Sequence, residues 1–226
     1  MTVEIGYRTR HKPRANVRSD VAETMSTRDR ILDASRQVFA RLGYVGTSIE
    51  HIVTQCHVSR GTFYYYFKNK EDVFEQLVLA LSKAWDGARA ASDVSDPYLR
   101  IEAGNRSYLQ MWAANPDILA NLFQIAAIEP RFDELHREIR IRFIERIRRN
   151  LERELASGNC RQLDPVVASH AMGEMVDSFA YRWLALRSVE IDHSELEHVV
   201  SELSELWYHA LYGGRPHEGG THGEAP

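Results

Sequence analysis

Small, hydroxyl-bearing and basic side chains lie close together between positions 59 and 70 of this sequence. Side chains of these types donate hydrogen bonds to phosphate oxygens and to the edges of nucleic-acid bases. Consecutive residues of a helix point about 100° apart, so three adjacent tyrosines cannot all be buried, and at least one hydroxyl face should be exposed. The chemistry that this run could support is DNA recognition. Its candidate residues are Ser59, Arg60, Gly61, Thr62, Tyr64, Tyr65, Tyr66 and Lys70.

A helix-turn-helix is predicted to position these side chains. An apolar pattern with helical spacing begins after Ser26 or Thr27, either of which can serve as the N-cap, and it ends at Gly43. The segment from Thr47 to Glu50 has the spacing of a reciprocal capping box. A second helix is therefore expected to begin at Thr47.

A short turn at residues 56–58 should hold a third helix, capped by Ser59, at a steep angle to the second. Phe63 and Phe67 are predicted to anchor this helix in the core, while its N-terminal turn approaches base edges. An ordinary packed aromatic cluster is the alternative for the whole run, because rings spaced along a helix are often core residues.

This stretch resembles the DNA-binding domain of the tetracycline-repressor (TetR) family. That family combines a first helix ending in Gly-Tyr or Gly-Phe, a threonine opening the second helix, and the run Ser-x-Gly-Thr-Phe-Tyr-x-Tyr-Phe-x-x-Lys-Glu-x-Leu. The chain matches at Gly43-Tyr44, Thr47, Ser59 to Phe67 and Lys70-Glu71, and it departs at Val73-Phe74, where the family often carries leucine. The resemblance covers about a fifth of the chain.

The resemblance also implies roles for individual side chains. Thr47, Tyr64, Tyr66 and Lys70 would hold phosphates, and Arg60, Gly61, Thr62 and Tyr65 would face bases; Thr27, Arg28, Ser48 and Ser59 complete the predicted DNA-binding set.

Basic residues concentrate in the N-terminal part of the chain. Residues 1–70 hold 12 Lys and Arg against 6 Asp and Glu, a net charge of +6, whereas residues 71–226 hold 16 against 26, a net charge of −10. Phosphate attracts the first part and repels the second, so DNA should dock on the N-terminal face. Residues 1–25 are interpreted as a disordered basic arm that follows the DNA backbone or enters the minor groove. A solvated leader, or a true start at Met25, is the alternative.

The fold is predicted to be all-α, because no strand alternation competes with the helical patterns. A helix-turn-helix domain over residues 26–72 would precede a helical ligand-binding and dimerisation domain over residues 73–213, followed by a disordered Gly-rich tail over residues 214–226. Prolines mark helix starts in the second domain. The helices expected there span about 70–91, 97–114, 116–128, 131–156, 165–189 and 194–212.

The last two predicted helices carry a dimer interface in this interpretation. Ser194 and Glu197 have the spacing of a capping box, and the helix that follows has an apolar stripe from Leu196 to Leu211. Two such helices per chain can pair with their symmetry mates as a four-helix bundle. The resulting homodimer would place two recognition helices about 34 Å apart on double-stranded DNA with an inverted repeat. The alternative is that the stripe packs only within its own domain.

Bulky aromatic and mixed-polarity side chains in the middle helices predict a ligand cavity. Ordinary core packing explains each of them taken singly, but members of the resembling family use this bundle to bind an inducer. The expected effector is a hydrophobic or amphipathic small molecule, and no cofactor is predicted. The candidate ligand-binding residues are Trp85, Asn105, Tyr108, Trp112, Phe123, Gln124, Phe143, Met175, Phe179 and Trp183.

Arginine is abundant over residues 131–153, which could form a second nucleic-acid surface or a phosphate site. Glu138 precedes Arg142, and Glu145 precedes Arg149, by four residues in the favourable order for ion pairs. A solvated, internally compensated helix face is therefore expected.

Catalytic and metal-binding motifs are missing from the sequence, which has no nucleophile elbow, phosphate loop, dinucleotide fingerprint or His-Glu-x-x-His. Cys56 and Cys160 lie far apart and fit neither a zinc site nor a disulfide framework. No apolar signal segment or stretch of 18 apolar residues occurs, so a cytoplasmic protein is expected.

The sequence thus predicts a homodimeric transcriptional regulator, a repressor that leaves its operator when an effector binds in the bundle. Effector binding is expected to tilt the helix beginning at Lys70 and so to change the separation of the two recognition helices. Two alternatives stay open: a ligand-independent or activating DNA-binding protein whose bundle serves only dimerisation, and a helical enzyme or carrier.

Overall fold

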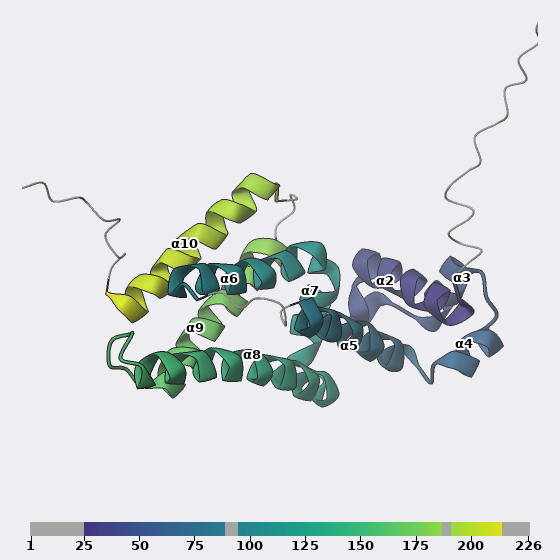
Figure 1. Cartoon of the computed structure of the whole chain (residues 1–226). Helices are drawn as coiled ribbons and strands as arrows, with labels where there is room; N and C mark the ends of the chain where they lie inside the picture. The colour runs from purple at the N-terminus through teal and green to yellow at the C-terminus, as the bar shows by residue number, and fades with distance from the viewer. Residues whose placement is uncertain (1–24, 89–94, 187–190, 214–226) are drawn as a thin grey trace, which may run out of the picture.

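Helices follow one another through the computed structural model, which describes residues 25–88, 95–186 and 191–213 (Figure 1). Within these ranges every regular element is helical, which confirms the predicted fold class. Positions 1–24 of the predicted arm, the predicted tail, and the expected helix ends near 91 and 189 lie outside the described residues. The elements are α2 (Thr27–Gly46), α3 (Ile49–Cys56), α4 (Arg60–Tyr66), α5 (Lys70–Ala88), α6 (Pro97–Ala114), α7 (Pro116–Ala126), α8 (Pro130–Ala156), α9 (Pro165–Ala180), the π-helix η1 (Tyr181–Ala185) and α10 (His193–Tyr212).

Helices α2, α3 and α4 form the helix-turn-helix. Ser26 caps α2 by accepting a hydrogen bond from the Asp29 amide at 3.1 Å. Gly43, expected to end this helix, interrupts it instead, and α2 continues to Gly46. The glycine has φ of 69° and ψ of 167°, a backbone conformation that is open almost only to glycine. Ser59 caps α4, as predicted, by accepting from the Thr62 amide at 3.0 Å.

Helix α3 begins later than the sequence pattern predicts. Its N-cap is Ser48, whose hydroxyl accepts from the His51 amide while the His51 ring nitrogen accepts from the Ser48 amide, both at 3.3 Å. Thr47 does not cap the helix, because it is buried and its hydroxyl donates to the Gly43 carbonyl at 2.7 Å. Glu50, expected to close the capping box, is left at the surface.

An aromatic cluster joins the helix-turn-helix to the helices that follow it. Phe39 and Tyr44 of α2 contact Phe74 of α5, with ring centroids 5.2 and 5.1 Å apart. Phe132 of α8 lies 5.4 Å from both Tyr44 and Phe74. Edge-to-face aromatic pairs of this kind add to the free energy of ordinary burial, so the two domains share part of one core.

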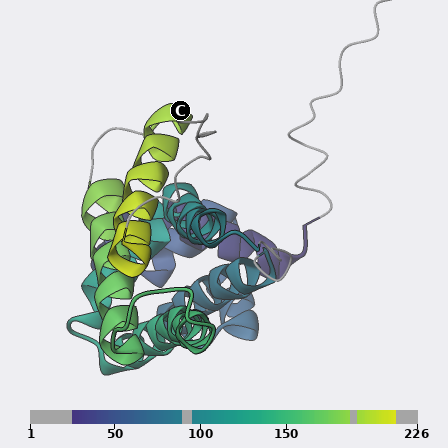
Figure 2. The ribbon, with the colours of Figure 1, turned by 60° about the vertical axis from the view of Figure 1, so that its left-hand side comes forward.

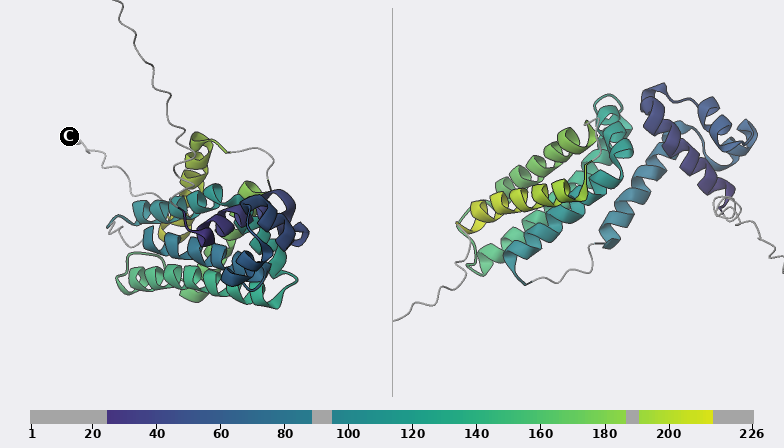
Figure 3. Two further views of the ribbon diagram at one scale, coloured as in Figure 1. Left: turned by 90° about the vertical axis from the view of Figure 1, so that its right-hand side faces the viewer. Right: turned by 90° about the horizontal axis from the view of Figure 1, so that it is seen from above.

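Helix α5 leads from the helix-turn-helix into a bundle made by α5 to α10 (Figure 3). Within the bundle α10 packs against α6, and α9 packs against α8 (Figure 2). Pro97, Pro116, Pro130 and Pro165 each lie at the first turn of a helix, as predicted. Among the described residues, none of the helices is both long and apolar enough to cross a membrane.

Most of the apolar stripe on α10 packs inside its own domain. Leu196, Val200, Leu203 and Trp207 are buried in the core that α10 forms with α6 and its neighbours, whereas Leu206 is exposed. Most of this stripe therefore packs within its own chain, and a dimer interface through the last two helices stays a prediction. Helical spacing shows that a face is buried, but it does not show against which partner.

The N-terminus of α10 also differs from the prediction. Asp192 caps the helix by accepting from the Glu195 amide at 2.8 Å, so Ser194 lies inside the first turn. Glu197, expected to complete a capping box with Ser194, instead pairs with Arg106 of α6 at 2.9 Å.

The helix that begins at Pro165 changes geometry at its end. Residues Tyr181–Ala185 form η1, where the Leu186 amide donates to the Tyr181 carbonyl, five residues back, at 3.3 Å. Such π-helical turns are rare and often lie at functional sites. Here the turn faces α7.

Candidate DNA-binding surface and central cavity

Helix α4 presents its three tyrosines to solvent. Tyr64, Tyr65 and Tyr66 are 49%, 82% and 36% exposed, whereas Phe63 and Phe67 are buried. The prediction that the two phenylalanines anchor the helix is confirmed. The same helix therefore has a buried aromatic face and an exposed phenolic face, and the second is open to a large ligand.

Arg60 is held at the start of α4 by two neighbours. One of its guanidinium nitrogens lies 2.6 Å from the Glu50 carboxylate of α3, and both side chains are more than half exposed. A hydrogen bond with Tyr64, and then the charge of Glu50, raise the pKa of Arg60. The capping-box interpretation of Glu50 concealed this pair, although a carboxylate in the first turn of α3 was the available signal.

The other predicted DNA-contacting residues differ in their exposure and in the contacts that they already make within the chain. Arg28 is exposed, lies over the Phe67 ring at 5.5 Å and donates to Gln76. The Thr62 hydroxyl, half-buried, is 2.9 Å from that of Ser59, so the cap also orients it. Gly61 is exposed, and Thr27 and Ser48 are partly exposed.

Thr47 and Lys70, both expected to hold phosphates, brace the turn after Gly43 instead. The Lys70 ammonium donates to the carbonyls of Tyr44 and Thr47 at 3.0 and 2.9 Å and lies 4.6 Å from the Tyr44 ring centroid. The Tyr44 carbonyl also accepts from the Thr47 amide at 3.3 Å, so Lys70 is its second donor, and the lysine is a donor to the Thr47 carbonyl beyond the end of α2. An ammonium has three N–H donors, so Lys70 keeps one beyond these two carbonyls, whereas the Thr47 hydroxyl is buried and already donates to Gly43.

A cavity of about 30 Å³ lies among α5, α6, α7, α8 and α9, and we term it the central cavity. It brings together five of the predicted ligand-binding residues: Trp85, Tyr108, Trp112, Phe123 and Phe143. Its volume is close to that of one water molecule and far below the roughly 300 to 1,000 Å³ of typical small-molecule sites. A ligand could enter only if these rings moved apart.

The other five predicted ligand-binding residues do not line the central cavity. Asn105 is buried and donates to a serine of α10 at 3.1 Å. Gln124 is exposed on α7, and Met175 lies on the outer face of α9. Phe179 and Trp183 stack on each other with ring centroids 5.3 Å apart. Residue spacing identified the aromatic helices but not which of their faces meet.

A polar group at the central cavity was missed by the sequence analysis. Asp177 of α9 is buried and accepts a hydrogen bond from the Tyr108 hydroxyl, and Arg140 Nε lies 4.0 Å from its second oxygen. Burial raises the pKa of Asp177 to about 6 and also raises that of Tyr108. Burial has the opposite effect on the basic side chain of His136, because it lowers the pKa of that group to about 4. An acidic residue next to Val176 on the largely apolar helix α9 was the available signal.

Helix α7 contacts the helix-turn-helix through polar side chains. Asn121 accepts from the Tyr44 amide at 2.6 Å and donates to the Phe39 carbonyl at 3.3 Å. Asp117 pairs with Arg36 of α2 at 3.2 Å. These contacts join residues more than 70 positions apart, and they fix α7 to the segment around Gly43.

The same helix reaches into the central cavity with Phe123. Its ring is stacked on Tyr181 of η1, with centroids 4.4 Å apart, and lies 5.6 Å from Trp112 and 4.7 Å from His136. A displacement of Phe123 would therefore act on a helix that is bonded directly to α2.

Neither metal binding nor reactive thiol chemistry has support in the part of the chain that the structure describes. No group of three His, Cys, Asp or Glu residues there could hold a metal ion. Cys56 and Cys160 are buried and form no disulfide, and burial raises the pKa of both thiols. Cys56 donates to the Ile52 carbonyl at 3.1 Å, as a small core residue would.

Comparison with known sequences agrees with this architecture. Residues 31–77 match the family described as bacterial regulatory proteins, tetR family. The chain is 23% identical to the regulator YhgD of Bacillus subtilis over 162 residues, which cover 68% of this chain and 82% of YhgD. It is 37% identical to the regulator UidR of Escherichia coli over 57 residues, 25% of this chain and 29% of UidR.

Solved structures share the whole fold. A putative TetR-family regulator from Syntrophomonas wolfei superposes with a TM-score of 0.67 at 22% identity, covering 85% of this chain and 97% of that one. The fatty acid degradation regulator FadR from Bacillus halodurans gives 0.67 at 23% identity, covering 81% and 95%. With the exposed face of α4, the capped helix-turn-helix and the family match, the chain belongs to the TetR family and is a DNA-binding transcriptional regulator.

Proposed function

We propose that this regulator binds an inverted-repeat operator as a homodimer and releases it when a hydrophobic or amphipathic small molecule enters the central cavity, so that it acts as a repressor. Helix α7 carries the proposal, because it places Phe123 in an aromatic cavity and is bonded through Asn121 to the helix-turn-helix. A ligand-independent regulator is the second candidate. The small volume of the central cavity, about 30 Å³, favours it.

The DNA contacts follow from the exposed face of α4. We expect Arg60, Gly61, Thr62 and Tyr65 to face bases, and Tyr64, Tyr66 and Lys70 to contact phosphates. The Glu50 carboxylate holds one edge of the Arg60 guanidinium and leaves other N–H donors for a base edge. Paired guanidinium donors match the two acceptors of guanine in the major groove.

Replacing Arg60 with lysine is expected to relax the sequence preference at one base pair by about 1 to 2 kcal/mol, because an ammonium cannot donate to both guanine acceptors in the same fixed geometry. Tyr66→Phe is the matched control, since the loss of a phosphate contact weakens binding to all duplexes alike. Titration of selected duplexes and their single-base variants measures both effects. Equal weakening of every duplex by Arg60→Lys would place Arg60 on the backbone.

An apolar row on α9 supports the homodimer. Val167, Ala171 and Met175 are exposed at intervals of four residues, so they share the outer face of the helix. Val167 is 65% exposed, and Leu206 of α10 is 59% exposed. Exposed apolar patches of this kind commonly mark protein interfaces. A second copy of the chain is the occupant that a palindromic operator requires.

Release of the operator requires an effector that binds the DNA-bound and the DNA-free conformations of the regulator with unequal affinity. In this mechanism the ligand separates Phe123 from its ring partners and moves α7, which strains the contacts of Asn121 with α2. The helix beginning at Lys70 moves with it, because α5 also contributes to the central cavity. A coupling of about 1 to 3 kcal/mol is typical of such systems.

Selection of bound sequences from a random duplex pool, with and without a small-molecule extract, tests the proposal. An inverted repeat that is lost on adding extract is the expected result; a repeat that persists in every extract would favour the ligand-independent candidate. Val167→Asp should select single half-sites, because a buried charge opposes the dimer. Ile128→Asp, at an exposed position between α7 and α8, is the control and should retain the repeat.

A further inference from the structure

The two helices that carry the DNA-reading face, α3 and α4, hold one acidic and one basic side chain. Between Thr47 and Phe67, Glu50 is the single Asp or Glu and Arg60 is the single Lys or Arg. The structure pairs them, because Nη1 of Arg60 lies 2.6 Å from Oε1 of Glu50. The two charges cancel, so this pair of helices has no formal net charge with which to attract phosphate.

The Glu50 carboxylate is stabilised in its charged form. Glu50 lies in the first turn of α3, where a negative charge is favourable. A hydrogen bond from its own backbone amide, and then the charge of Arg60, lower the pKa of the Glu50 carboxyl. Glu50 is therefore an anion at neutral pH, and it holds the Arg60 cation from the neighbouring helix.

The Arg60 guanidinium is held from two sides. It pairs with Glu50 of α3, and it donates a hydrogen bond to the Tyr64 hydroxyl, one turn further along α4. A guanidinium has five N–H donors in a rigid plane, so donors remain for a base edge. Their orientation is set before DNA binds, which reduces the entropy that the side chain loses on recognition.

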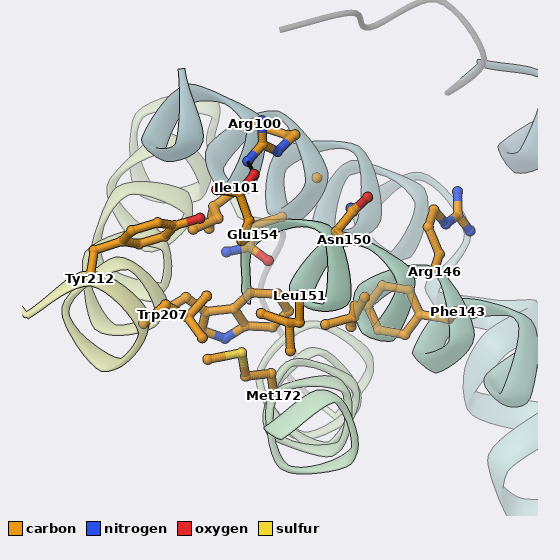
Figure 4. A pocket seen from close by; sticks show the side chains of 14 residues that line it. Arg100, Ile101, Phe143, Arg146, Asn150, Leu151, Glu154, Met172, Trp207 and Tyr212 are labelled. Atoms are coloured by element: carbon orange, nitrogen blue, oxygen red, sulfur yellow. Dashed lines mark hydrogen bonds and ion pairs between the residues drawn. The ribbon is translucent and has the colours of Figure 1, made fainter. Parts of the chain in front are cut away.

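Exposure distinguishes this ion pair from one that holds the bundle together. The Arg60 and Glu50 side chains are 59% and 55% exposed. Arg100 and Glu154, which join α6 to α8 at the wall of a cavity between α6, α8, α9 and α10, are only 26% and 14% exposed (Figure 4). Exposed ion pairs contribute little to the free energy of unfolding. Folding therefore gains little from the pair of Glu50 and Arg60.

The ion pairs expected within α8 differ from those in the structure. Arg142 donates to Ser82 of α5 at 3.0 Å rather than to Glu138. Glu145 pairs with the arginine three residues further on, at 2.6 Å, rather than with Arg149. Pairs of the second kind form between neighbours on one helix. The partners at positions 50 and 60, in contrast, meet only because the turn between α3 and α4 brings the two helices together.

A carboxylate beside the guanidinium changes which DNA group the arginine prefers. Phosphates lie along every duplex, so an arginine without an acidic neighbour binds them at any sequence. The Glu50 carboxylate repels a phosphate at that place. A guanine edge offers two uncharged acceptors in the major groove, which the same carboxylate repels far less. The pair therefore favours a base edge over the backbone.

We propose that Glu50 is a positioning residue that sets sequence specificity through Arg60, because it keeps the guanidinium away from phosphates and directs its remaining donors to a guanine. The inference rests on the proposed base contact of Arg60. In this role Glu50 lowers the affinity of the regulator for random DNA and increases its discrimination between the operator and other sequences.

Glu50→Gln tests this role in the full chain, because it removes the charge and keeps the size of the side chain. Fluorescence anisotropy measures binding to duplexes selected with the native chain, to their single-base variants and to a random-sequence duplex. At about 0.1 M salt we expect the random duplex to bind about fivefold more tightly, with a salt slope steeper by about 0.9. Discrimination at the base pair that Arg60 contacts should fall about fivefold. Unchanged discrimination would overturn the proposal.

Asp33→Asn is the matched control, an exposed acid-to-amide change on α2 in the same domain. It should leave base discrimination unchanged; an effect as large as that of Glu50→Gln would assign the result to the charge of the domain and not to the pair. Glu50→Asp retains the charge and should keep the native affinity for random DNA. A merely structural role of Glu50 predicts the opposite sign, since damage to the fold weakens binding to every duplex.

Arg60→Ala separates a failure of this inference from a failure of the proposed base contact. If Arg60→Ala leaves base discrimination intact, Arg60 does not face a base, and both ideas are wrong. If Arg60→Ala reduces discrimination and Glu50→Gln does not, only the role of Glu50 is wrong.

The double variant completes the test. Glu50→Gln added to Arg60→Ala should cause no further loss of discrimination, because Glu50 acts through the arginine. A further loss at another base pair would show that Glu50 itself accepts from a cytosine amino group, and it would contradict the proposal. These measurements need no effector, so they stand apart from the release mechanism.

Discussion

Replacing Asp177 with asparagine is expected to raise the free energy of unfolding at pH 7.5 by about 2 to 3 kcal/mol. The pKa of this carboxyl rises from 3.8 to about 6 on folding, because burial penalises the charged form, and each pKa unit corresponds to about 1.4 kcal/mol. Asparagine retains an acceptor for the Tyr108 hydroxyl without a charge. In the native chain, the contribution of Asp177 to the free energy of unfolding is complete below pH 3.8, where the carboxyl is neutral, and this contribution is lost as the pH rises through 6.

His136 contributes the opposite pH dependence. Its pKa falls from 6.5 to about 4 on folding, so its contribution is complete above pH 6.5 and is lost as the pH falls through 4. The two contributions therefore oppose each other between about pH 4 and 6.5. Stability of the native chain should be nearly flat in that window, whereas Asp177→Asn should gain stability as the pH rises.

Urea denaturation at a series of pH values between 4 and 8 measures this difference. Glu202→Gln, an exposed acid-to-amide change on α10, is the control and should follow the native curve. A variant no more stable than the native chain at pH 7.5 would mean that the Asp177 charge is well compensated by Arg140 in the folded protein.

Asn121→Ala is expected to lower the free energy of unfolding by about 2 to 4 kcal/mol, since it leaves the buried Tyr44 amide without an acceptor and removes the bond to the Phe39 carbonyl. If the proposed function holds, the same change should also weaken the effector's influence on operator binding. The DNA-reading face of α4 would be intact, but α7 would no longer hold α2.

Thermal and chemical denaturation of Asn121→Ala should be compared with Asn115→Ala. Asn115 precedes α7 and donates to the Met111 carbonyl, one turn back, so its loss should cost about 1 kcal/mol. Equal effects of the two substitutions would show that the Asn121 contact does not join the domains.

Local chemistry in the sequence predicted the helix starts well. Proline fixes a backbone angle suited to a first helical turn, and the hydroxyl of Ser59 has one nearby amide to accept from, so these positions depend little on the rest of the fold. Adjacent hydroxyl residues defeat the same reasoning. Thr47 and Ser48 offer similar caps, and only the carbonyl left open at Gly43 decides that Thr47 turns inward.

Tertiary contacts account for what the sequence could not predict. Most of the stripe on α10 is buried against α6, and the sequence could not name that helix because periodicity identifies a face and not its partner. Five predicted aromatic residues meet in one cavity, whereas Met175 lies on the opposite side of its helix. Asp177 escaped notice because only the assembled core makes a carboxylate at that position costly.

The contact between Tyr181 and Phe123 depends on the number of residues in the π-helix η1. A π-turn holds one more residue than an α-turn, so the deletion of a single residue within η1 would restore α geometry and shift by one the residue that faces α7. In evolutionary terms, the deletion of one residue can remove the stacking of Tyr181 on Phe123 even when every other residue of the chain is unchanged. Homologues that lack this extra residue should therefore differ in how η1 meets α7, even where their aromatic residues are the same.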